Sequence, residues 1–497
     1  MNQRKMGAFL SYINIGIQTL LGFVYVPLLL YYMGKSQYGL YQLMGSLIAY
    51  FGVMDFGLSV VVVRFYSKYK ALHDSLKLEN FLAFIQRAYG YITALVLTIG
   101  SALYFFIDII FAKGLTPSEL IDAKYIYILL LLNIMITLLG MMYRSVITAN
   151  ERFVFLKGIE TLQLCIQPAV VIAVMREWPS AFAMAAVMTV INLLLTAIRV
   201  YYCFFVLKIH VKYHFFDLSL FQEAKKLAVS SFTITIVDQV FWKTNQIILG
   251  ALINTAAVAV YSISSLFYMG YMSLSTAISG VFLPKVTELV TQKVANRELS
   301  DLFIRIGRVQ YLILALVLSG FMVLGREFIH LWAGPDFSDA YWITLLIIIP
   351  FTIDLIQNIG LSIMQARNTY GFRAKVYCGI GIFNLILAIP MASYYGGIGC
   401  AFASGLSMFI GNGIIMNWYY ASVEKLDICR FWKEILSMSV GVLTVFCIGY
   451  AVNLWMGNGG RLLFAIKVFL YILLYAVVMR YAAMNDYEKG LLHFMRK

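Results

Sequence analysis

The apolar run from residue 228 to residue 253 carries many polar side chains for its length. It is long enough to cross a bilayer as a helix, which needs about 20 apolar residues. Wound at about 100° per residue, it gathers these polar side chains in a sector of roughly 160°: Ser231, Thr235, Asp238, Gln239, Trp242, Lys243, Asn245 and Gln246. A charge facing lipid near the bilayer centre costs about 2.5–3.5 kcal/mol. The run therefore predicts a membrane helix with one side turned to a water-filled cavity, or to a packed interior where the polar groups satisfy one another.

Composition extends this prediction to the whole chain. Of the 497 residues, 62% are hydrophobic and 12% are charged, whereas a soluble protein is nearer about 25% charged. Apolar runs of this length are helical spans rather than barrel strands, because every backbone polar group in lipid must be satisfied within the segment. We expect an all-α, polytopic membrane protein. Fourteen spans are predicted, at residues 8–32, 39–63, 82–108, 125–149, 159–176, 181–207, 228–253, 256–284, 309–332, 341–365, 376–393, 398–420, 435–456 and 462–484.

The basic residues are distributed very unequally between the connecting segments. If the N-terminus is cytoplasmic, 30 of the 38 Lys and Arg residues flank the spans on the cytoplasmic side and six on the outer side. This is a strong positive-inside bias, which predicts that both termini are cytoplasmic. The net charge of +14 then serves topology and attraction to anionic membrane lipids. Nucleic acid is not an expected partner.

Weak internal matches indicate a duplication. Residues 41–47 resemble 261–266 at a shift of 220, and residues 149–155 resemble 366–372 at a shift of 217. A repeat of six spans gives two halves of like orientation, with a substrate site expected between them. The predicted divisions are an N-terminal lobe, a cytoplasmic linker, a C-terminal lobe, and two extra helices with a cytoplasmic tail, at residues 1–207, 208–227, 228–420 and 421–497 respectively.

Polar stripes on several spans supply the candidate site residues. The substrate is expected to contact Lys243, Arg87, Arg144, Arg64, Gln239, Asn245, Gln246, Asn14 and Gln18. Carboxylates within or beside the spans are expected to couple transport to a proton or a sodium ion, namely Asp238, Asp55, Asp354 and Glu160. Lys243 is the leading candidate because it lies nearest mid-membrane on the widest polar face.

Each charged candidate also has a structural interpretation. Arg64, Arg87, Arg144 and Arg199 lie near cytoplasmic ends, where each is suited equally to being a topology anchor or a ligand for an anion. Asp55 can be a hydrogen-bond acceptor in a kinked helix. Glu160 can pair with Arg144, and Asp354 with Arg367. Lys467, near the end of the last span, is expected to extend its amine towards the membrane surface.

Motifs for other chemistries are absent from the sequence. There is no GxxxxGK[ST] phosphate loop, no nucleophile–base arrangement and no convincing metal-ligand cluster. We therefore expect neither an enzyme nor a cofactor beyond the coupling ion.

Several segments resemble a known family. They are 27–34 (PLLLYYMG), 38–41 (YGLY), 55–58 (DFGL), Arg64, 67–69 (SKY), 150–153 (NERF) and 396–401 (GGIGCA). The chain resembles the Wzx-type oligosaccharide flippases, which move O-antigen or other polysaccharide repeat units and belong to the multidrug/oligosaccharidyl-lipid/polysaccharide exporter superfamily. Related lipid II flippases keep arginines in the first span, where this chain has Asn14 and Gln18.

The resemblance implies two six-helix lobes around a cavity and an undecaprenyl-pyrophosphate-linked oligosaccharide as cargo. It further implies alternating access in the bacterial cytoplasmic (inner) membrane, a role in lipopolysaccharide or other polysaccharide biosynthesis, and other polysaccharide assembly proteins as partners. The alternative of the same fold is a multidrug or organic-cation antiporter, in which the carboxylates form the substrate site. A membrane enzyme is disfavoured by the short outer loops, and a scaffold subunit by the charges within spans.

Overall fold

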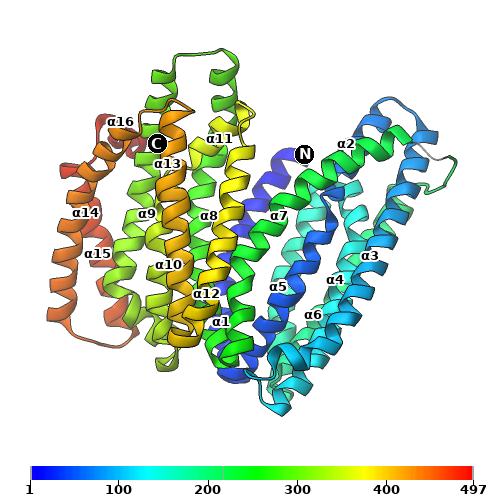
Figure 1. The fold of residues 1–497 in the computed structure, drawn as a ribbon, viewed down its shortest axis with the longest axis horizontal. Helices are drawn as coiled ribbons and strands as arrows, with labels where there is room; N and C mark the ends of the chain where they lie inside the picture. Colours follow the sequence, from blue (N-terminus) through cyan, green and yellow to red (C-terminus); the bar gives the residue numbers. More distant parts are fainter. Residues whose placement is uncertain (1–2, 216–217, 495–497) are drawn as a thin grey trace. The chain divides into compact units, whose positions relative to one another are not determined.

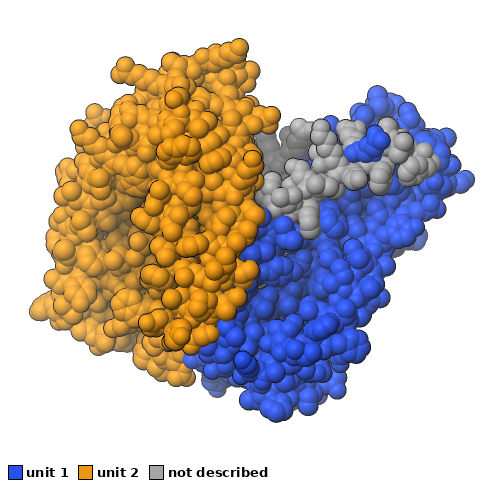
Figure 2. Space-filling model, viewed as in Figure 1, with its two compact units in different colours: residues 1–259 blue, residues 260–497 orange. Residues whose placement is uncertain are grey.

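The computed structural model describes residues 3–215 and 218–494, and these residues form helices joined by short connections, with no β-strand among them. Two compact units divide the chain, unit 1 at Met1–Ala259 and unit 2 at Val260–Lys497 (Figure 2). Unit 1 therefore includes the run at 228–253, which the sequence predicts to lie in the C-terminal lobe. The division into two six-helix lobes stays a prediction.

Unit 1 is built from long helices that pack side by side (Figure 1). Its elements are α1 Gln3–Gly52, η1 Val53–Asp55, α2 Leu58–Ala71, α3 Ser75–Phe111, α4 Pro117–Ala149, α5 Phe153–Glu177, α6 Ala181–Tyr201, the π-helical turn η2 Tyr202–Val206 and α7 Leu218–Leu252. One hydrophobic core joins α2, α3 and α4 through buried side chains such as Phe65, Phe81, Ile85 and Val146.

Unit 2 contains the remaining elements, and α8 begins at the end of unit 1. They are α8 Thr255–Thr291, α9 Asn296–Trp332, η3 Pro335–Phe337, α10 Asp339–Leu355, α11 Asn358–Ala366, α12 Gly371–Met408, the π-helical turn η4 Phe409–Ile415, α13 Met416–Ser422, α14 Ile428–Met456, α15 Arg461–Ala482 and α16 Asp486–Phe494. The extra helices α14 and α15 pack on α9 through a core that includes Ala315, Val445 and Tyr475.

The helices agree with the predicted membrane spans. Eleven continuous stretches of the described residues are long and apolar enough to cross a membrane. Two of them, Gly16–Ala71 and Gly371–Ser422, each cover two predicted spans. Gly34 (φ 74°) and Gly396 (φ 56°) break the helical backbone between those spans, and glycine adopts this left-handed region without steric cost. The run at 228–253 lies in α7, so the structure is consistent with fourteen spans.

Helix starts follow local sequence signals. Thr116 and Glu119 form a reciprocal capping box at the start of α4, with Pro117 in its first turn, which satisfies backbone N–H groups that have no partner inside a helix. Asp74 caps α3 by accepting the backbone N–H of Lys77 at 3.0 Å. This hydrogen bond favours the ionised carboxylate and lowers the pKa of Asp74 below its usual value.

The backbone repeats with the spacing of the sequence matches. Non-glycine residues with positive φ end three turns in each half: Glu151 and Asn368 are 217 residues apart, Lys208 and Lys425 are also 217 apart, and His73 and Lys293 are 220 apart. The hydrogen bonds that close these turns recur too, as in Arg152 N to Ile147 O and Thr369 N to Met364 O. Equivalent turns at a constant spacing are typical of a duplicated chain.

Buried ion pairs join the helices of unit 2, and two of them correct our expectations. Lys467 does not extend to the surface, since its side chain is 2% exposed and its amine pairs with Glu327 at 2.6 Å. The partner of Asp354 is Arg373 rather than Arg367. A partner 140 residues away, as Glu327 is from Lys467, leaves no local signal in the sequence.

The short helix α16 is held by a third buried ion pair. Arg308 of α9 donates to both carboxylate oxygens of Glu488 at 2.6 and 3.0 Å, and to Glu434 of α14 at 2.6 Å. The Glu488 side chain is 1% exposed. Because fork-to-fork pairs of this kind are strong and directional, α16 is fixed to α9 and α14.

Candidate functional site

Helices α4, α5 and α6 of unit 1 bring four charged side chains together. Arg144 donates to Oε1 of Glu160 at 2.7 Å, and Lys157 donates to Oε2 of the same carboxylate at 2.8 Å. Arg199, in the last turn of α6, lies near enough to Arg144 and Glu160 to interact electrostatically with both. We call Arg144, Lys157, Glu160 and Arg199 the cationic cluster, since two cations pair with one carboxylate and a third lies near them.

Helix α1 holds the first turns of α5 in place beside the cluster. The Asn14 amide donates to the Lys157 carbonyl at 3.4 Å, and the Thr161 hydroxyl donates to the Asn14 side-chain oxygen. Asn14 is buried, so its amide positions the Lys157 backbone. The structure thus brings together three predicted site residues, Asn14, Arg144 and Glu160. The predicted pairing of Arg144 with Glu160 is confirmed.

The cluster has unused capacity for an anion. The Arg144 side chain is 51% exposed, so part of its guanidinium is free to meet a ligand. The Nε atom of Arg199 is buried and finds no hydrogen-bond acceptor among the described residues. Guanidinium groups bind phosphate oxygens through paired, charge-assisted hydrogen bonds. An anion at this position would supply the acceptors that Arg199 lacks.

The second half of the repeat has no counterpart of this charge. At the shift of 217 residues, Arg144 corresponds to Leu361, Lys157 to Ala374 and Glu160 to Tyr377. Positive-inside anchoring acts on both halves of a chain alike. A charge cluster confined to one half therefore favours a binding role over a purely topological one.

The polar face of α7 is partly used in packing. Gln246 is buried, and its side-chain oxygen accepts a hydrogen bond from the Ser46 hydroxyl of α1. The hydroxyls of Thr244 and Tyr50 form a second hydrogen bond between these helices. Lys243 directly precedes Thr244, is half-buried, and forms no ion pair or hydrogen bond with any described residue. Its ammonium group is the part of this face that a ligand could neutralise.

The other α7 candidates have varied environments. The Oε1 atom of Gln239 is buried without a hydrogen-bond partner in the described part of the chain. Asn245 is buried, and Asp238 is half-buried; both take part in polar contacts. The Ser231 side chain lies outside the described residues.

The remaining carboxylate candidates are tied into the fold. Asp55 lies at the break between α1 and α2. Its carboxylate accepts hydrogen bonds from the hydroxyls of Tyr89 at 2.7 Å and Ser59 at 2.8 Å. This is the arrangement of a structural acceptor in a kinked helix. Asp354 accepts hydrogen bonds from both terminal nitrogens of Arg373, at 3.1 and 3.2 Å. Both side chains are about nine-tenths buried.

The other polar candidates lie apart from these contacts. Arg87 stacks over Tyr213 of the segment before α7, 4.0 Å from the ring centroid. Arg64 is exposed and lies 6.0 Å from the Phe65 ring. Gln18 is exposed on α1. No described contact joins these three to the cationic cluster.

Sequence reasoning missed Lys157 and Arg373 as members of these sites. Lys157 is one of the basic residues that flank the spans, and it precedes Glu160 by three residues, a spacing that places two side chains on one helix face. Arg373 gave no such signal, because a helix break and a turn separate it from Asp354.

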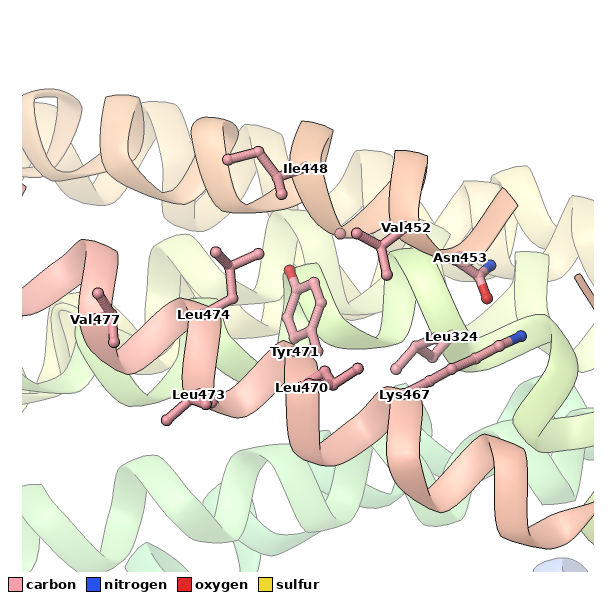
Figure 3. A pocket seen from close by; sticks show the side chains of 11 residues that line it. Leu324, Ile448, Val452, Asn453, Lys467, Leu470, Tyr471, Leu473, Leu474 and Val477 are labelled. Carbon is pink, nitrogen blue, oxygen red and sulfur yellow. The ribbon is translucent and has the colours of Figure 1, made fainter. Parts of the chain in front are cut away.

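A narrow groove runs between α14 and α15 of unit 2 (Figure 3). Its volume is about 360 Å³ and its lining is almost entirely apolar, with Leu324, Ile448 and Leu474 among the side chains. Lys467 and Asn453 lie at one end of the row of side chains. With its lysine already paired to Glu327, this groove offers little to a sugar or a phosphate.

Comparison with known proteins places the chain in a family. A model of the polysaccharide biosynthesis protein family matches residues 5–290, which is more than half of the chain. The chain belongs to the polysaccharide biosynthesis protein family. A protein of Shigella flexneri described as an O-antigen transporter is 21% identical over 402 residues, covering 78% of this chain and 90% of that protein.

Solved structures show the same fold at low sequence identity. The lipid II flippase MurJ in an inward closed conformation superimposes with a TM-score of 0.75 at 18% identity, covering 95% of this chain and 98% of that one. An inward-facing multidrug resistance transporter of the MATE family, in the MOP superfamily, superimposes with a TM-score of 0.61 at 11% identity. The match covers 84% of this chain and 95% of that one. This member of the polysaccharide biosynthesis protein family is thus a multi-pass membrane protein that shares the fold of these transporters.

Proposed function

We propose that this protein moves an undecaprenyl-pyrophosphate-linked oligosaccharide from the cytoplasmic to the outer leaflet of the bacterial inner membrane, for surface polysaccharide biosynthesis. The observation that carries the proposal is the cationic cluster. Three cations around one carboxylate, in helices of a membrane transporter, are suited to a lipid-linked anion.

Each part of this cargo needs a different surface. The pyrophosphate needs fixed cations, which Arg144, Lys157 and Arg199 offer at the end of α4 to α6 that the charge distribution assigns to the cytoplasm. The lipid tail can stay in the bilayer. Lys243, further along unit 1, can neutralise the phosphates during passage.

Glu160 has a defined part in this proposal. Without cargo its carboxylate holds Arg144 and Lys157, which limits the repulsion among the cations. Bound pyrophosphate would compete for the same donors, and a proton taken up by Glu160 would release them. We infer that ion coupling acts here, in addition to any effect at Asp238, and that transport proceeds by alternating access.

The organic-cation antiporter has less support. A cationic substrate needs carboxylates that are free to meet it, yet Asp55, Asp354 and Glu160 each accept two hydrogen bonds from nearby side chains. Saturable binding of a hydrophobic cation, abolished by Asp238→Asn, would favour this alternative instead.

The proposal is tested by translocation of a fluorescent undecaprenyl-pyrophosphate oligosaccharide in proteoliposomes. Arg199→Gln should lower the transport rate about 10- to 100-fold, the range expected when a charged hydrogen bond worth about 1.5–3 kcal/mol is lost. The matched control is Arg176→Gln, an exposed arginine at the far end of α5, which should transport normally. Wild-type protein that moves no glycolipid would refute the proposed function, and equal rates in the two variants would refute the role of the cluster.

A further inference from the structure

A polar pocket lies in unit 2, at the ends of α9, α10 and α14 that the charge distribution predicts to face outward. Its volume is about 800 Å³, within the range of about 300–1,000 Å³ that holds small ligands. Its lining combines the exposed aromatic rings of Trp342 and Tyr450 with the side chains of Arg326, His330 and Asn458. We call this the outer pocket.

The outer pocket carries a positive charge, that of Arg326. The Arg326 guanidinium lies 5.7 and 5.6 Å from the ring centroids of Tyr341 and Trp342, and no described carboxylate forms an ion pair with it. The neighbouring carboxylate, Glu327, is already paired with Lys467 at 2.6 Å. An anionic group entering the pocket would therefore meet an arginine free to bind it.

The wall of the pocket also contains an unused hydrogen-bond acceptor. The Oδ1 atom of Asn453 is buried and has no donor among the described residues, while its amide nitrogen donates to the Val323 carbonyl at 3.3 Å. A buried acceptor without a donor is costly. A hydroxyl group donated by a ligand would satisfy it.

We propose that the outer pocket binds a saccharide that carries a carboxylate, such as a hexuronic acid residue. The C–H face of a sugar ring packs against aromatic rings like those of Trp342 and Tyr450. Its hydroxyl edge both donates and accepts, which suits Asn453 and Asn458. Arg326 meets the carboxylate.

Our assignment of this saccharide to the transported glycolipid rests on the proposed function, because the sugars of a translocated glycolipid would emerge on the outer side. A pocket there would hold the sugar after translocation and oppose its return. The pocket chemistry itself depends only on the lining residues.

The test uses the full-length protein in nanodiscs and saturation-transfer NMR with two probes, cellobiouronic acid and its neutral counterpart cellobiose. The acidic disaccharide should bind about 10-fold more tightly or better, the effect of one charge-assisted hydrogen-bond pair. Arg326→Gln should remove that difference, and Trp342→Ala should abolish binding of both probes. The matched controls Arg461→Gln and Trp455→Ala, exposed at the same end but outside the pocket, should bind as wild type does.

Absence of binding to wild type, or binding that survives Trp342→Ala, would overturn the proposal. An anionic phospholipid that co-purifies with the protein, is lost in Arg326→Gln by native mass spectrometry and is displaced by neither disaccharide would overturn it as well. The translocation assay on the same preparations separates the two claims. A protein that transports glycolipid but binds no disaccharide refutes the outer pocket alone, and one that binds disaccharide but transports nothing refutes the proposed function alone.

Discussion

The ion pair of Asp354 with Arg373 provides the clearest test of whether a carboxylate within a span stabilises the fold or couples transport to an ion. Their side chains are 9% and 10% exposed, and two hydrogen bonds of 3.1 and 3.2 Å join them. Removing one member of such a pair leaves the other charge buried without compensation, which costs about 3–5 kcal/mol. Solvent screening is slight at this burial, so the estimate needs little reduction.

The perturbation is Asp354→Asn, which keeps the shape of the side chain and removes its charge. At about 2–4 °C per kcal/mol for a unit of this size, the apparent thermal midpoint should fall by about 6–20 °C. Intrinsic fluorescence during heating of the detergent-solubilised protein measures this. The double variant Asp354→Leu with Arg373→Met should recover most of the loss, because an apolar pair of similar volume needs no desolvation.

The matched control is the exposed pair of Arg430 and Asp301, whose side chains are 47% and 40% exposed. Asp301→Asn should change the midpoint by no more than about 2–4 °C, since exposed pairs contribute about 0–1 kcal/mol. If Asp354→Asn kept the wild-type midpoint but lost the pH dependence of transport, Asp354 would be a coupling group and the structural argument would be refuted.

Three further predictions concern other charged groups. Glu488→Ala should free α16 from Arg308. The rate of amide hydrogen exchange in residues 486–494 should then rise by at least about 10-fold, while exchange in the rest of unit 2 is unchanged. Exchange in residues 486–494 at the wild-type rate would mean that the ion pair does not hold this helix. Lys467→Ala should destabilise the protein by about 3–5 kcal/mol because Glu327 stays buried, measured as the thermal midpoint, and a surface lysine would show no such loss. Lys243→Ala should slow glycolipid translocation without lowering the midpoint; a wild-type rate would end its proposed role.

Features that depend on local chemistry were predictable from the sequence. The span boundaries followed from apolar runs, and Gly34 and Gly396 interrupt the helices where those runs are interrupted. The repeat emerged from weak matches because equivalent turns need the same backbone, as at Glu151 and Asn368. The pair of Arg144 and Glu160 was accessible because a short turn joins the helices that carry them.

Features that depend on distant partners were not predictable in the same way. A helical wheel shows that Gln246 lies on a polar face, but not that Ser46 of α1 occupies that face. It shows a lysine near a helix end at position 467, but not the buried Glu327 beside it. Polar stripes in membrane helices serve both packing and cavities, and only the neighbouring helix decides between them.

The central claim is that the cationic cluster binds the pyrophosphate of a lipid carrier. Native mass spectrometry of nanodisc-embedded protein, titrated with undecaprenyl pyrophosphate, undecaprenyl phosphate and undecaprenol, tests it most directly. The account predicts that affinity falls in that order and that Arg199→Gln weakens pyrophosphate binding about 10- to 100-fold with little effect on undecaprenol. Equal affinity for the three lipids, or pyrophosphate binding unchanged by Arg199→Gln, would contradict it.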